Sequence, residues 1–130
     1  MRRPIAALSV ALALLVTGCG SPPGEDAVAG TAREWLAAAG AGDATALCRL
    51  LTPAARASVA TGGDTCERAV ADLDLPGGGS VGRVEMWSDE AQVRTGEDTL
   101  FLVRLTPGWR VNGAGCQPRA DLPYDCEVAG

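Results

Sequence analysis

Few side chains in this 130-residue sequence could carry chemistry. It contains no histidine, and all 11 of its basic residues are arginine. Nucleophilic sites of the Ser/His/Asp or Cys/His type, histidine-ligated metal centres and lysine Schiff bases are therefore excluded. Five cysteines remain, and a thiol can take a lipid, form a disulfide or bind a metal. Cysteine chemistry is the main chemistry that this composition permits.

The first cysteine, Cys19, follows a leader typical of exported proteins. Two arginines precede an apolar run over 5–16, which is shorter than the about 20 residues that a membrane-spanning helix needs. The residues directly before the cysteine, Val16-Thr17-Gly18, resemble the lipobox of bacterial lipoproteins. The resemblance implies cleavage before Cys19 and a thioether-linked diacylglycerol on its sulfur. The alternative is an ordinary secreted protein in which Cys19 is one more disulfide candidate.

These features divide the chain into three parts. We expect 1–18 to be a lipoprotein signal peptide, 19–26 a lipidated tether with two stiffening prolines, and 27–130 a single domain. Cleavage would remove two arginines and no acid, which lowers the formal charge from −5 to −7. So acidic a domain is not expected to bind nucleic acid. The expected location is the outer face of the cell membrane, through the lipid on Cys19.

The other four cysteines are Cys48, Cys66, Cys116 and Cys126. An even number in an oxidising compartment predicts two disulfides, and we expect Cys48 to pair with Cys66 and Cys116 with Cys126, because each pair is close in sequence and flanked by turn residues. The alternative is a four-cysteine zinc site, although the short cysteine spacings of such sites are missing. We predict no metal and no cofactor.

Helical periodicity begins directly after the expected tether. Apolar residues recur at helical spacing over 27–39, and Gly40-Ala41-Gly42 ends this helix. Asp43 is a predicted N-cap for a second helix over 44–51.

Two further short helices are predicted before the sequence pattern changes. Thr52-Pro53 combines an N-cap with a proline in the first turn and predicts a helix through Ala60. Asp64 and Glu67 resemble a capping box at the start of a fourth helix, which would place Cys66 on the buried side.

Beyond the glycine-rich break at 76–79 the pattern changes to alternation, which predicts strands joined by short turns. The fold class is therefore α+β, with three to four N-terminal helices packed on a curved antiparallel sheet of about four strands. The candidate strands are 81–87, 91–95, 99–106 and 108–114.

Three stretches of this sequence resemble one family. They are the helix at 32–38, the segment from Gly42-Asp43-Ala44 to 48–53, and the strand at 109–116, which starts Trp-Arg-Val-Asn-Gly. They resemble small exported lipoproteins of actinobacteria with a nuclear-transport-factor-2-like, or cystatin-like, cone domain. The resemblance implies a cavity between the first helix and the inner face of the sheet.

The three tryptophans, Trp35, Trp87 and Trp109, are most of the five aromatic residues. They could line that cavity as an apolar pocket, or simply fill the core of an alanine-rich domain. Enzymes of this fold commonly use an Asp, His or Tyr in the cavity, and in this sequence Glu85 is the candidate general base. A carboxylate on a strand is more usually solvated.

Pairs of acids stand at the expected tether and hairpin tips, and match no calcium-binding loop, so we expect them to be exposed and to keep the surface soluble. The run at 77–79 lacks the Lys-Ser/Thr of a phosphate-binding loop and is interpreted as a linker. The acid pairs are Glu25 with Asp26, Asp89 with Glu90, and Glu97 with Asp98.

The C-terminal segment from Cys116 to Cys126 is predicted to be an irregular loop, because Pro118 and Pro123 cannot donate to a sheet ladder. We expect Tyr124 to pack at the mouth or edge of the cone, with any partner or ligand site beside it. The alternative is a loop that merely holds the C-terminal end in place.

Taken together, these features favour a noncatalytic binding or accessory module anchored to the membrane. Its partner would be an unknown protein or a small apolar ligand. The alternatives are a small cone-fold enzyme that acts on an apolar ligand, and a structural envelope protein.

Overall fold

The computed structural model describes residues 24–121 and 123–130. In this part of the chain four helices are followed by five strands, which confirms the α+β order and adds one strand to the expected number. The helices are α1 (Glu25–Ala41), α2 (Ala44–Leu50), α3 (Pro53–Val59) and α4 (Cys66–Ala71). The strands are β1 (Val81–Trp87), β2 (Glu90–Thr95), β3 (Thr99–Arg104), β4 (Trp109–Gln117) and β5 (Asp125–Ala129).

Side-chain caps determine where α2 and α3 begin. The carboxylate of Asp43 accepts a 3.0 Å hydrogen bond from the amide of Ala46, and the hydroxyl of Thr52 accepts one of 3.0 Å from the amide of Ala55. Both predicted N-caps are therefore confirmed. Helix α1 begins earlier than expected, because Glu25-Asp26 forms its first turn instead of ending the tether. Carboxylates in the first turn stabilise the helix, because they lie near the positive end of its dipole.

The predicted start of the fourth helix is wrong. The N-cap of α4 is Thr65, whose hydroxyl accepts a 3.2 Å hydrogen bond from the amide of Arg68. Asp64, predicted as the cap with Glu67, instead lies 3.7 Å from the Arg68 guanidinium. A threonine one residue later provides the capping oxygen, and the helix begins after it.

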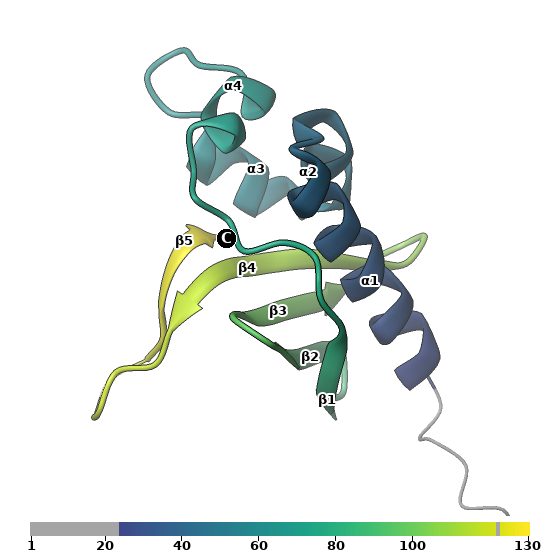
Figure 1. Ribbon diagram of the computed structural model, residues 1–130. Coiled ribbons are helices and arrows are strands. Elements are labelled where there is room, and N and C mark those ends of the chain that lie inside the picture. Colours follow the sequence, from purple (N-terminus) through teal and green to yellow (C-terminus); the bar gives the residue numbers. More distant parts are fainter. Residues whose placement is uncertain (1–23, 122) are drawn as a thin grey trace, which may run out of the picture.

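The sheet is a meander in the order β1-β2-β3-β4-β5, with every neighbouring pair antiparallel. The helices lie on one side of it (Figure 1), so none of the described helices covers its other face. The prediction of an irregular loop over 116–126 is wrong at both ends, because β4 and β5 extend into that segment. Pro118 and Pro123 lie in the connection between the two strands and remove no hydrogen bond from the ladder.

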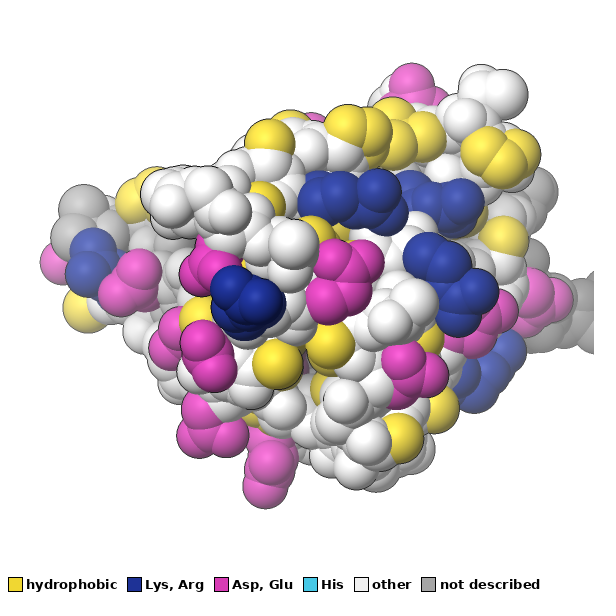
Figure 2. All heavy atoms as spheres, turned by 90° about the horizontal axis from the view of Figure 1, so that it is seen from above, with side chains coloured by type: hydrophobic (Ala, Val, Ile, Leu, Met, Phe, Trp, Pro, Cys, Tyr) yellow, Lys and Arg dark blue, Asp and Glu magenta, His cyan; other side chains and the backbone are white. Residues whose placement is uncertain are grey.

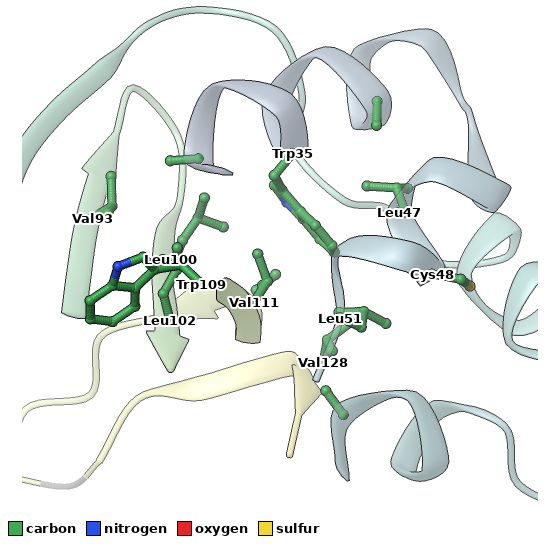
Figure 3. Packing of buried hydrophobic residues seen from close by; sticks show 14 of the residues in the cluster. Trp35, Leu47, Cys48, Leu51, Val93, Leu100, Leu102, Trp109, Val111 and Val128 are labelled. Carbon is green, nitrogen blue, oxygen red and sulfur yellow. The ribbon is translucent and has the colours of Figure 1, made fainter. Parts of the chain in front are cut away.

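Side chains from the sheet and the helices fill the space between them (Figure 3). Trp35 is fully buried and lies over the sheet. The amide of Thr52 donates a 2.9 Å hydrogen bond to the carbonyl of Val111, which ties the junction of α2 and α3 to β4. The buried side chains that meet there include Val28, Leu47, Leu51, Val93, Leu100, Leu102, Val111 and Val128.

Both predicted disulfides are confirmed. Cys48 is bonded to Cys66, which joins α2 to α4, and Cys116 is bonded to Cys126, which joins β4 to β5. The zinc alternative is wrong, because all four sulfurs are used in these bonds. In the chain-entropy model each bond stabilises the domain by roughly 3 kcal/mol.

One acid of the predicted hairpin tips is not exposed. Asp98 follows β2 and is only 6 % exposed, whereas its neighbour Glu97 is exposed. The Asp98 carboxylate accepts hydrogen bonds from the backbone amides of Thr99, Gly115 and Cys116. These bonds offset the cost of burying a charge.

Candidate functional site

Tyr124 packs on the face of the sheet that the helices leave uncovered. Leu100 and Leu102 are buried beneath the helices, so Phe101 between them points to the opposite face. The ring of Tyr124 lies edge-on to the ring of Phe101, with their centroids 5.1 Å apart. Tyr124 therefore lies against the sheet.

A glycine makes room for this contact. Gly113 of β4 lies directly opposite Phe101 of β3. A Cβ atom at that position would lie 3.3 Å from the Phe101 ring, which is tighter than ordinary van der Waals contact. The absence of a side chain leaves a shallow apolar hollow of about 300 Å³. It is lined mainly by Phe101, Gly113, Pro123, Tyr124, Cys126 and Ala129.

The hollow is held by bonds on both sides. The Cys116–Cys126 disulfide fixes β5 beside β4. Asn112, which also lines the hollow, accepts a 2.6 Å hydrogen bond from the Thr52 hydroxyl and donates one of 3.3 Å to the carbonyl of Gly130. The hollow offers a mostly apolar surface, and the side chain of Asn112 within it already makes two hydrogen bonds to the protein.

The structure does not bring the three tryptophans together around a pocket. Trp35 is fully buried and Trp109 is 6 % exposed, and both belong to the core (Figure 3). Trp87, at the end of β1, is 54 % exposed. Trp35 and Trp109 therefore fill the core, as one of the two alternatives expected. Trp87 neither fills the core nor lines a pocket with the other two.

Glu85 does not point into a closed pocket. Its register partner is Gln92, whose own partner on β3 is Phe101, so Glu85 lies on the uncovered face. Its carboxylate forms a 2.7 Å ion pair with Arg83, and its side chain is 35 % exposed. The enclosed carboxylate that the enzyme alternative requires is not provided by Glu85.

Cys19, the expected signal peptide at 1–18 and the expected tether up to residue 23 lie outside the described residues. In the part that is described, none of the helices combines the length and apolar character needed to cross a bilayer. Residues 24–121 and 123–130 also contain no cluster of three or more side chains suited to hold a metal ion.

Sequence reasoning missed Phe101 and Gly113, which line the hollow together with Tyr124. The alternation of Leu100, Phe101 and Leu102 carried a signal, because it places the ring on the face opposite the two leucines. Nothing in the sequence indicated that Gly113 lies across from that ring.

The fold and the hollow define a small α+β domain with an uncovered sheet face. Comparison of the chain with protein-family models, curated proteins and solved structures finds no match.

Proposed function

We propose that this protein is an exported lipoprotein, anchored through Cys19 at the outer face of the cell membrane, whose domain is a noncatalytic binding module. The leader and the residues before Cys19 support the anchor. The order of helices and antiparallel strands is compatible with a cone domain of the nuclear-transport-factor-2-like type. The sequence lacks histidine and lysine, which favours binding over catalysis.

The hollow beside Tyr124 is the observation that carries the binding proposal. It places two aromatic rings and the Cys116–Cys126 disulfide around an apolar surface open to solvent. Loops and edges held on a rigid scaffold often carry recognition. At about 300 Å³ the hollow is at the small end of ligand sites and suits a small apolar ligand.

Titration of the protein with indole, followed by NMR, tests this proposal. We expect shifts at Phe101, Tyr124 and Ala129, and we expect Tyr124→Ala to abolish them. Tyr124→Phe should preserve them, because it keeps the ring. Trp87→Ala is the matched control, since Trp87 is an exposed aromatic outside the hollow.

Two outcomes would refute the proposed site. One is indole binding that survives Tyr124→Ala in a protein with unchanged melting. The other is equal loss of binding in Tyr124→Ala and Trp87→Ala, which would indicate nonspecific contact with exposed rings.

A further inference from the structure

We propose that a second, separate site binds an organic anion with an apolar body. The site is an open groove of about 710 Å³ between α2, α3, α4 and the turn that joins β3 to β4. Arginines from three elements line it: Arg49 of α2, Arg56 of α3 and Arg110 of β4. In the view from above, several arginine side chains lie close to one another, with acidic side chains beside them (Figure 2).

These three arginines differ from most others in the protein. Within residues 24–121 and 123–130, Arg49, Arg56 and Arg110 form no ion pair. Glu67 is the single acid among the described residues that line the groove. The groove is therefore net positive in a chain of formal charge −5, which indicates an anionic ligand. The arginines that do form ion pairs are Arg68, Arg83, Arg104 and Arg119.

Two of the guanidinium groups are held in place by the backbone. Arg56 donates from Nε to the carbonyl of Cys48 at 3.1 Å and from Nη2 to the same oxygen, and Arg110 donates from Nη1 to the carbonyl of Trp109 at 3.0 Å. Each guanidinium has five N–H groups, so both retain donors for a ligand. The Cys48–Cys66 disulfide also borders the groove and joins α2 to α4. Donors fixed in advance lower the entropic cost of binding.

The rest of the groove is largely apolar. Leu105 is 36 % exposed and is one of two large hydrophobic side chains exposed in the described part of the chain. Pro53, Ala57 and Pro107 are also exposed along the groove. The volume lies within the range of small-molecule sites, which is about 300–1,000 Å³. A medium-chain fatty acid would match both features of the groove, because its carboxylate could bind the arginines and its hydrocarbon chain could lie on the apolar wall.

A second groove beside the first helps to decide where the anion would bind. Arg49 and Arg110 also line this second groove of about 580 Å³, but Glu34 and Asp43 add negative charge there. The net positive groove beside Leu105 is therefore the better anion site.

The position of the groove in the domain bears on the source of the ligand. The adjoining groove follows the C-terminal half of α1, including Ala37 and Ala41. Helix α1 has 17 residues, so it is about 25 Å long. Both grooves thus lie away from Glu25, where the chain continues to Cys19. The groove is therefore far from the point where the chain leaves toward the proposed anchor at Cys19, which favours a free amphiphilic anion over a membrane lipid.

Photolabelling of the full chain tests this proposal. The probe is decanoic acid that carries a diazirine, and the uncharged comparison is the corresponding alcohol. We expect the acid to label peptides that contain Leu105 or Ala57, and excess decanoate to prevent this labelling. The alcohol should label these peptides far less, because it lacks the charge that the arginines bind.

Charge-matched variants identify the residues responsible. We expect Arg49→Gln with Arg110→Gln to raise the apparent Kd for decanoate about tenfold or more. Arg33→Gln with Arg94→Gln removes the same charge from exposed arginines that line neither groove, and should leave the Kd unchanged. If the first double variant does not fold, Arg49→Gln alone serves, since Arg49 is exposed and forms no side-chain hydrogen bond in the described residues.

Four outcomes would overturn the proposal. The first is equal labelling by the acid and the alcohol, and the second is an equal loss of affinity in the two double variants. The third is binding to phosphatidylglycerol vesicles that depends on Arg49 and Arg110 while free decanoate does not bind. Labelling confined to the Tyr124 peptide would also exclude this groove, and would leave the hollow as the apolar site.

Discussion

The carboxylate of Asp98 accepts a 2.8 Å hydrogen bond from the backbone amide of Cys116. Its other oxygen accepts a 2.8 Å bond from the amide of Gly115. Gly115 has a φ of 65°, and this left-handed conformation helps two successive N–H groups converge on one acid. Asp98 therefore fastens the turn between β2 and β3 to the strand that carries the Cys116–Cys126 disulfide.

Replacing Asp98 should destabilise the domain. Asp98→Asn keeps the size but removes the charge and places an NH₂ group among backbone donors, so we expect the free energy of unfolding to fall by about 2–3 kcal/mol. Urea denaturation measures the change. Glu97→Gln removes the same charge from an exposed position in the same turn and should have almost no effect. Equal effects of the two substitutions would contradict the role of Asp98.

Gly115 should tolerate no side chain. An added Cβ would lie 2.8 Å from Cβ and Cγ of Glu127, in a left-handed backbone conformation that favours glycine. We expect Gly115→Ala to cost roughly 2 kcal/mol of stability. Gly96→Ala is the control, because a Cβ there meets nothing within 4 Å. Comparison of the two melting temperatures decides the matter, and an unchanged melting temperature for Gly115→Ala would count against this geometry.

Removal of either disulfide should lower stability. We expect Cys48→Ser with Cys66→Ser, and Cys116→Ser with Cys126→Ser, each to cost roughly 3 kcal/mol. Thermal melting measures the loss, and a reductant should lower the melting temperature of the unmodified protein. Peptide mapping without reduction checks the pairing itself. A peptide joining Cys48 to Cys116 would be incompatible with the fold described here.

The proposed anchor depends on one thiol. Cys19→Ala should abolish labelling by a fatty-acid analogue and release or misprocess the protein, because the lipobox-like segment offers the diacylglycerol no other thiol. Labelling of cells followed by membrane fractionation measures both effects. Cys126→Ser is the control, since it removes a cysteine far from the leader. Continued labelling of Cys19→Ala would refute the anchor.

Local interactions made much of the fold predictable. Asp43 and Thr52 cap helices through bonds to residues three positions away, so the sequence pattern alone located these helix starts. The disulfide partners are 18 and 10 residues apart, and close spacing also identified them. Alternation of apolar residues similarly indicated β1 to β4.

Contacts between distant residues decided the rest. Strand β5 has one buried side chain, Val128, and exists because it pairs with β4, so its own composition carried little strand signal. Burial of Asp98 depends on amides 17 and 18 residues later.

Both proposed sites also depend on contacts between residues that are distant in the sequence. Tyr124 meets Phe101 only after β5 folds back along the sheet. Arg49, Arg56 and Arg110 belong to three elements that only packing brings to one groove. The sequence by itself determined the four helices, the first four strands and the cysteine pairing, because these follow from short-range bonding and periodicity. Only the tertiary structure decided the binding surfaces, because each combines side chains that are far apart along the chain.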